Sequence, residues 1–401
     1  MAEEVTGADD SDDLRALLGG GPVPFPKRKE RKFQPWHRPR KQYVRRAQWC
    51  REISNLARDL KRTKGELSEI RYLTLPGNDL LDIRQIAETI CAPQQIELRY
   101  LGFNSAAIPT AEDQPELDGA QFSINRMDWI QRQSEVFAGD FRRVADTRSV
   151  PYQRMKRDAP FHAINIDLCG GFAGREKDQG VPNYFTALRA ILHNQARFDE
   201  PFLLFITTRM DDDNVAEEVK ETLLRLAQEI HDTCLGYSAA FADAWGVQEG
   251  DAPVLVPQVV DTSEAFMLGL TQWIISNAIS FELKASVRSF MTYRTGLGVG
   301  EDDIVSLAIR LKREVVLPPD PHELGQPFNA SPSQAERQCE QSAIVPERVS
   351  KRTRVDALLR TQAEEFERCI GESSALLGSA GYDPVEYRTW AIQQEGLDAT
   401  S

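Results

Sequence analysis

Short apolar runs alternate with helical patterns through the middle of the chain. Runs of this kind are typical of strands that are buried on both faces. We expect strands at 70–75, 95–103, 135–141, 163–168 and 202–207. We expect helices at 80–90, 124–137, 183–197 and 215–233, and a loop at 104–120. This alternation predicts an α/β fold, a Rossmann-like and mostly parallel sheet with helices on both faces.

The pattern changes in the last third of the chain. Leu283–Tyr293 and Ile304–Leu311 alternate with period two, which predicts a C-terminal antiparallel hairpin at the end of the parallel sheet. The stretch 316–350 holds six prolines, and we interpret it as a linker. After it, apolar residues at helical spacing predict a helical C-terminal extension at 351–401, whose last helix begins near Asp383-Pro384.

The N-terminal 64 residues contain two segments of opposite charge. Residues 1–26 hold six acidic residues and one arginine without an apolar pattern, which predicts a disordered acidic tail. Residues 27–46 hold ten basic residues and one acidic residue, with aromatic residues between them. Helical spacing begins near Lys41 and continues to about Thr63, so residues 27–64 are expected to form a basic arm and a helix.

The net charge bears on the class of partner. The 401 residues carry a formal net charge of −13, which taken alone argues against a nucleic acid partner, because phosphates repel an acidic body. Residues 27–46 carry +9, however, so the rest of the chain carries −22. The average charge therefore does not exclude a phosphate-bearing partner, and it points to the basic arm as the place where one binds.

Composition also bears on the compartment. The most apolar long window, 265–281, contains five polar residues and is too polar for a membrane helix, and the acidic N-terminus is unlike a secretory signal. The six cysteines and five histidines form no cluster, so neither a disulfide framework nor a metal site is expected. Single cysteines suit a reducing cytoplasm. We therefore expect a cytoplasmic protein that does not contact a membrane.

The residues that follow the predicted strands are the candidate site. In an open parallel sheet, ligands bind at the carboxyl ends of the strands, near the point where the strand order reverses. The segments at these ends all carry Gly, Asn or Asp, and they are Thr74–Asp79, Gly102–Asn104, Gly139–Phe141, Asp167–Gly171 and Thr207–Asp212. The same residue types are common in ordinary turns, so a purely structural explanation stays open.

The order of elements over 65–315 resembles that of the class I S-adenosylmethionine-dependent methyltransferases. These enzymes have a glycine-bearing turn after the first strand, a polar residue after the second, an Asp at the third, and an acidic motif after the fourth. An antiparallel hairpin ends their sheet. The corresponding segments here are Leu75-Pro76-Gly77-Asn78-Asp79, Phe103-Asn104, Gly139-Asp140-Phe141 and Asp167-Leu168-Cys169-Gly170.

Within this superfamily, the Asp-x-x-Gly motif is similar to that of the tRNA guanosine dimethyltransferases, in which the acid faces the amine to be methylated. The resemblance implies S-adenosylmethionine as cofactor, bound by Gly77, Asn104 and Asp140. It also implies that Asp167 and Gly170 face the methyl acceptor. The chain departs from the family pattern in three places. It has one glycine in the first turn, Asn104 in place of the ribose-binding acid after the second strand, and Leu168 and Cys169 in the catalytic motif. From the residues alone, a helix N-cap is an equal explanation of Asp167.

The basic arm predicts contact with nucleic acid. Basic side chains neutralise phosphates, and aromatic side chains stack on unpaired bases. The candidate residues are Trp36, Arg38, Arg40, Lys41, Tyr43, Arg45 and Arg46. In the alternative explanation, the aromatic residues pack on the sheet while the charges neutralise the acidic body. The C-terminal helices are a candidate surface for a protein partner.

These observations lead to two main functional hypotheses, beside a third in which a nucleotide-processing enzyme uses the same strand ends. The first is an S-adenosylmethionine-dependent methyltransferase-like protein that acts on or binds nucleic acid. The second is a Rossmann-like binding or assembly subunit without catalysis. The presence of a single glycine in the turn after the first strand favours this second hypothesis. A basic block before a Rossmann-like domain also resembles uncharacterised bacterial proteins encoded near phage-defence loci.

Overall fold

In the computed structural model the chain divides into two units, Met1–Gln34 and Pro35–Ser401. The structure describes residues 31–108, 111–168, 170–174, 180–247, 260–296, 300–315, 322 and 332–394. The predicted acidic tail and the first residues of the basic arm lie outside the described residues. All helices and strands below belong to the second unit.

A mixed sheet forms the centre of this unit, with eight strands in the described part of the chain. The strands are β1 (Glu69–Thr74), β2 (Glu97–Phe103), β3 (Glu135–Phe137), β4 (Ala163–Asp167), β5 (Phe202–Arg209), β6 (Leu283–Tyr293), β7 (Ile304–Arg313) and β8 (Thr353–Arg354). Their order is β3-β2-β1-β4-β5-β7-β6-β8. Strands β1 to β5 pair in parallel, and β7 runs antiparallel to both β5 and β6. The predicted α/β fold, a mostly parallel sheet ending in an antiparallel hairpin, is confirmed.

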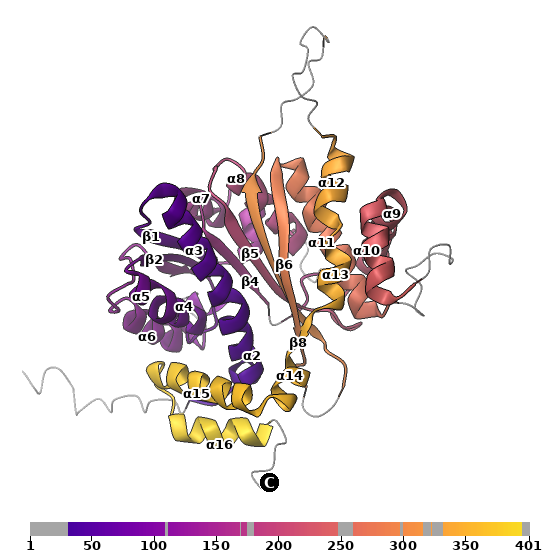
Figure 1. Ribbon diagram of the computed structural model, residues 1–401. Coiled ribbons are helices and arrows are strands. Elements are labelled where there is room, and N and C mark those ends of the chain that lie inside the picture. The colour runs from indigo at the N-terminus through magenta and orange to yellow at the C-terminus, as the bar shows by residue number, and fades with distance from the viewer. Residues whose placement is uncertain are drawn as a thin grey trace, which may run out of the picture. The chain divides into compact units, whose positions relative to one another are not determined.

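Helices precede the sheet, connect its strands and follow it (Figure 1). Before β1 come η1 (Pro35–His37), α2 (Pro39–Val44), η2 (Arg45–Cys50) and α3 (Arg51–Lys64). The connections hold α4 (Leu81–Ile86), η3 (Ala87–Cys91), α5 (Ala92–Gln94), η4 (Ser105–Ala107), α6 (Gln114–Ile124), η5 (Phe141–Ala145), α7 (Val150–Asp158), α8 (Tyr184–Gln195), α9 (Glu217–Thr233), α10 (Leu235–Trp245) and α11 (Thr262–Ser280). After β7 come α12 (Gln334–Ser342), α13 (Val345–Ser350), α14 (Val355–Thr361), α15 (Ala363–Ser379) and α16 (Pro384–Gln394).

The two faces of the sheet are buried by different helices, as the alternation along β5 shows. Leu204 and Ile206 belong to a continuous apolar core that includes residues of α8 and α11. Phe205, which points to the opposite face, packs against Trp49, with 6.5 Å between the ring centroids. Figure 1 shows α3 crossing this second face in front of the strands. Burial on both sides explains why β5 begins with a continuous apolar run, Phe202–Ile206.

One predicted loop contains a helix. Residues 104–120 were expected to be a loop and 124–137 a helix, whereas the structure has α6 at Gln114–Ile124. The prediction was wrong because Pro115 lies in the first turn of α6, followed by Glu116. Proline is tolerated at that position, where its missing N–H would have no helical partner, and an acidic residue there suits the helix dipole.

The predicted linker at 316–350 is wrong in its second half. Ser333 and Glu336 form a capping box that starts α12. Pro346 occupies the first turn of α13, so it again marks the beginning of a helix. Of residues 316–331 the structure describes 322 alone.

The expectation that the cysteines stay single is also corrected. Cys234, which caps α10, forms a disulfide with Cys339 of α12, across a separation of 105 residues. Neighbouring cysteine spacings cannot indicate a pair that only the packing of two distant helices brings together.

Among the described helices, none has both the length and the apolar character needed to cross a bilayer.

Candidate functional site

The strand order brings the predicted site residues to one edge of the sheet. The chain leaves β1 towards β2 and β3 on one side and continues with β4 and β5 on the other, so the order reverses between β1 and β4. Thr74, the last residue of β1, pairs with Gly102 of β2 and with Asn165 of β4. The segments that follow these parallel strands therefore begin at the same, carboxyl edge, where ligands bind in sheets of this kind.

The turn after β1 is shaped by Asn104. The Asn104 amide Nδ2 donates to the Pro76 carbonyl at 2.8 Å and to Asn78 Oδ1 at 3.1 Å. This pair of bonds joins the end of β2 to the turn after β1. A Cβ atom built at Gly77 meets no atom within 4 Å, so the space beside this glycine is open. Asn104 thus holds the turn that contains Gly77 in place through these hydrogen bonds.

Asp140 begins the short helix η5 after β3. Its carboxylate accepts hydrogen bonds from the Arg142 backbone N–H at 2.9 Å and from the Arg142 guanidinium at 2.7 Å. Burial opposes ionisation of Asp140, but these hydrogen bonds and the charge of Arg142 outweigh it and lower the pKa of the carboxyl. The side chain keeps 32% of its surface exposed. Asp140 is therefore an ionised, partly accessible carboxylate at the edge of the sheet.

Asp167, at the end of β4, is paired with Lys41 of the basic arm. The Lys41 ammonium donates to Asp167 Oδ1 and to the Tyr293 hydroxyl, the latter at 3.2 Å, and it lies 4.8 Å from the centre of the Trp49 ring. Burial lowers the pKa of Lys41, but the charge of Asp167 and the contact with Tyr293 raise it above its ordinary value. Lys41 is thus a cation that fixes one carboxylate oxygen.

The second oxygen of Asp167 forms no hydrogen bond with a described residue. Within the described part of the chain, Asp167 Oδ2 has no hydrogen-bond partner, and the side chain is 25% exposed. The helix N-cap explanation of Asp167 is wrong, because the described residues between it and α8 are not helical and Asn183 caps α8. Asp167 is instead the last residue of β4, and its carboxylate is held by the ion pair with Lys41.

Gly170 and its neighbour Gly171 differ in their steric surroundings. A Cβ at Gly170 meets no atom within 4 Å, whereas one at Gly171 would lie 2.1 Å from the Asn214 carbonyl oxygen. The close approach of the two loops therefore requires glycine at 171, which the sequence motif did not single out. Cys169 lies outside the described residues.

The predicted nucleic-acid-binding residues of the arm are mostly buried within the second unit. Arg38, Arg40, Lys41 and Arg45 are each less than 8% exposed. The Arg40 guanidinium lies 3.0 Å from the Asp356 carboxylate and donates to the Arg294 carbonyl at 2.6 Å. These basic side chains cannot reach a phosphate while the arm keeps this position.

The other three arm residues lie nearer the surface. Arg46 is paired with Glu365 and with Glu372, at 3.0 Å for the latter. Tyr43 is half-buried, 5.5 Å below the Arg46 guanidinium, and Trp36 is 45% exposed. The intramolecular alternative thus describes the charges of the arm in this structure, whereas Trp36 keeps nearly half of its surface exposed. The nucleic acid contact itself stays a prediction.

Two residues that contact the turn after β1 were not predicted as site residues from the sequence. Tyr382 donates to Asp79 Oδ2 at 2.8 Å, and His37 Nε2 lies 3.5 Å from the same oxygen. The arm and the C-terminal extension, more than 300 residues apart in sequence, thus meet at the turn after β1. Neither residue belongs to a motif, so the sequence gives no signal for this contact.

A buried polar network lies behind the turn. Asp82 Oδ2 accepts from the Tyr72 hydroxyl at 2.8 Å and from Thr74 Oγ1 at 2.7 Å, and Asn165 Nδ2 donates to the same tyrosine oxygen at 2.9 Å. The network ties β1, β4 and α4 together where the strand order reverses.

Among the described residues, no group of three or more His, Cys, Asp or Glu side chains is arranged to hold a metal ion.

The chain matches the model of a protein family. The model of a family described as PP_RS20740-like matches residues 30–392, which include the sheet, the basic arm from Glu30 and the C-terminal helices. No curated protein matches the chain.

Proposed function

This chain belongs to the PP_RS20740-like family, and we propose that it is an S-adenosylmethionine-dependent methyltransferase-like protein that acts on nucleic acid. The observation that carries the proposal is the strand order β3-β2-β1-β4-β5, followed by the hairpin of β6 and β7. This order collects Gly77, Asn104, Asp140 and Asp167 at the carboxyl edge. Of these, Gly77, Asp140 and Asp167 match the pattern of the class I methyltransferases, whereas Asn104 stands where that pattern has an acidic residue.

The residues at this edge fit the proposed cofactor on two counts. The open space beside Gly77 permits a ligand to approach the backbone of the turn. The ionised and partly exposed carboxylate of Asp140 can accept hydrogen bonds from amine or hydroxyl groups. Asn104 would keep the turn in shape by holding the Pro76 carbonyl. S-adenosylmethionine, when bound, supplies a methyl group on a positively charged sulfur.

Asp167 is the residue proposed to orient the methyl acceptor. Lys41 fixes Oδ1, which leaves Oδ2 to accept a hydrogen bond from an amine. Alignment of the amine is the main contribution that methyl transfer to nitrogen requires from a protein. Lys41 would act through Asp167, as a positioning residue.

Isothermal titration with S-adenosylmethionine tests the proposal. We expect heat of binding and a thermal shift for the wild type, and loss of both for Gly77→Val, because the new side chain enters the open space. Gly119→Val is the control, since a Cβ at that exposed helix position also meets no atom within 4 Å. Absence of binding by the wild type at millimolar concentration would refute the proposal.

One observation favours a second function, that of a binding or assembly subunit without catalysis. The Asp167 carboxylate is already paired with Lys41. In the turn after β1, the Asp79 carboxylate is already in contact with His37 and Tyr382. Transfer of a labelled methyl group to nucleic acid distinguishes the two functions. The methyltransferase predicts transfer that Asp167→Ala abolishes at nearly unchanged cofactor affinity. The subunit predicts no transfer by the wild type.

A further inference from the structure

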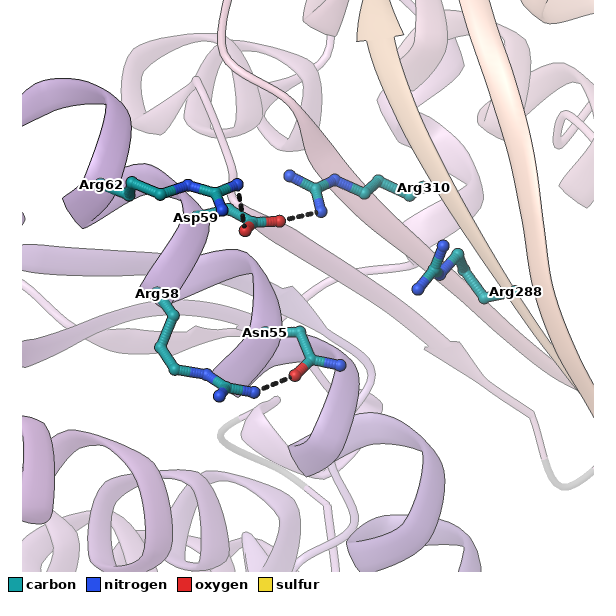
Figure 2. A pocket seen from close by; sticks show the side chains of 6 residues that line it. All are labelled: Asn55, Arg58, Asp59, Arg62, Arg288 and Arg310. Atoms are coloured by element: carbon teal, nitrogen blue, oxygen red, sulfur yellow. Dashed lines mark hydrogen bonds and ion pairs between the residues drawn. The ribbon is translucent and has the colours of Figure 1, made fainter.

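A hollow of about 380 Å³ lies between α3 and the β6–β7 hairpin, away from the four residues of the proposed site. Its lining consists of polar and charged side chains, namely Asn55, Arg58, Asp59 and Arg62 of α3, Arg288 of β6 and Arg310 of β7. Four arginines and one aspartate give this lining a net charge of +3. Figure 2 shows the guanidinium groups of Arg288 and Arg310 pointing from the hairpin towards α3.

Two carboxylates hold the arginines in place. Asp59 accepts from Arg310 at 2.5 Å and from Arg62 at 3.0 Å, and the hydrogen bond from Arg310 is the main reason that the pKa of Asp59 is lowered. The buried carboxylate of Glu52 accepts from Arg288 Nε at 3.1 Å. Arg58 bonds to the Asn55 side chain. The carboxylates thus orient the guanidinium groups without neutralising all four.

Most N–H groups of these arginines have no acceptor among the described residues. Asp59 contacts one terminal nitrogen each of Arg310 and Arg62, and Glu52 contacts Nε of Arg288. Within the described ranges of the chain, the other guanidinium nitrogens of these three residues have no hydrogen-bond partner. Each guanidinium carries five N–H donors in a planar arrangement that matches the oxygens of a phosphate. The hollow is therefore a set of oriented, unused donors for an anion.

The positive surface continues beyond the hollow in both elements. Arg51, Asn55, Arg58 and Arg62 recur at spacings of three and four and so lie on one face of α3. On β7, Arg310 and the exposed Lys312 are two residues apart and share a face. The stripe on α3 spans about 16 Å at 1.5 Å per residue. At about 3.4 Å per phosphate, a nucleic acid strand places about five phosphates along such a length.

We propose that this surface, defined by Arg58, Arg62, Arg288 and Arg310, binds the phosphodiester backbone of a nucleic acid. A single phosphate would leave most of the stripe unused, whereas a strand follows it. The lining holds no aromatic or apolar side chain, so it offers no platform for bases. Binding through phosphates alone is independent of base sequence. This surface differs from the predicted arm, in which Arg38, Arg40, Lys41 and Arg45 are buried. Its test does not involve S-adenosylmethionine.

Charge reversal at two exposed arginines tests the proposal. Arg58→Glu/Arg62→Glu changes two surface positions of α3. The control, Arg225→Glu/Arg368→Glu, makes the same change in net charge at two exposed helix arginines on α9 and α15. The full-length variants are titrated against a fluorescein-labelled oligonucleotide by anisotropy, over a series of salt concentrations. Circular dichroism and thermal melting of each variant verify that it is folded.

We expect the first variant to bind at least about tenfold more weakly, with a salt dependence shallower by about two phosphate contacts. The control should bind like the wild type. Equal weakening in both variants would overturn the proposal, because it would reflect net charge and not this surface. Competition by inorganic phosphate as effective as that by unlabelled oligonucleotide, counted per phosphate, would also overturn it in favour of a site for a free anion. Failure of the wild type to bind would overturn it outright.

Discussion

At the scale of single residues, the ion pair between Lys41 and Asp167 connects two segments that the sequence treats separately. Asp167 was predicted as a site residue because it follows a buried strand. Lys41 was predicted to contact nucleic acid because it lies in a basic block. Its actual partner is 126 residues away, and charge patterning cannot indicate which members of a basic block become buried. The edge of the sheet was thus predictable, whereas the contacts made there were not.

A double-mutant cycle measures this pair. Lys41→Met leaves a mostly buried carboxylate without its cation and should lower the free energy of unfolding by about 3 kcal/mol. Asp167→Asn should cost a similar amount, and the double variant should cost less than the sum by about 1–3 kcal/mol. Urea unfolding of the four proteins gives these values. Additive effects would show that the two side chains contribute independently.

Glu200 makes stability depend on acid pH. The hydrogen bond with His162 at 2.9 Å and the contact with Lys64 lower the pKa of Glu200 from 4.5 to about 2. A carboxyl with a lowered pKa contributes stability above its unfolded pKa and loses it as the pH falls. Stability should therefore decline between about pH 4.5 and pH 2, and less steeply in Glu200→Gln.

Urea midpoints at pH 6 and pH 3 test this prediction. Glu301→Gln is the control, because Glu301 is exposed and has no ion pair with any described residue. If wild type and Glu200→Gln lose the same stability between the two pH values, the ion pair does not determine the acid response.

At the scale of elements, strands were predicted more accurately than helices. The apolar runs predicted the bounds of β1, β2, β4 and β5 to within two residues. Their apolar residues are buried against the helices that cover the sheet. The helices α6, α12 and α13 were missed, since proline near their first turns was taken as a sign of a loop. Proline breaks a helix when it lies in the interior of the helix, but it is tolerated in the first turn.

The disulfide between α10 and α12 has a measurable effect. Closing a loop of about 100 residues in the unfolded chain should contribute roughly 3–5 kcal/mol to stability. A reductant should therefore lower the urea midpoint of the wild type and of Cys369→Ala, which retains the bond, but leave Cys339→Ala unchanged. Of the six cysteines, at most four should react with iodoacetamide in the unfolded, unreduced chain. Alkylation of all six without reduction would exclude the bond.

At the scale of the whole second unit, the basic arm joins the sheet to the C-terminal extension. Arg40 pairs with Asp356 at the start of α14, Arg46 pairs with Glu365 and Glu372 of α15, and Tyr387 of α16 donates to the His37 carbonyl at 2.7 Å. The arm's positive charge thus compensates acidic groups within the molecule. The arginines proposed to meet phosphate are on α3 and the hairpin, where no basic block marks them in the sequence.

The central claim is that S-adenosylmethionine binds at the carboxyl ends of β1, β2 and β3. Ultraviolet cross-linking of the radiolabelled cofactor, followed by peptide mapping, tests both the binding and its place. The account predicts label in the peptides that contain Gly77, Asn104 or Asp140, and loss of that label in Gly77→Val. Label confined to α3 and the hairpin, or no specific label at millimolar cofactor, would contradict it.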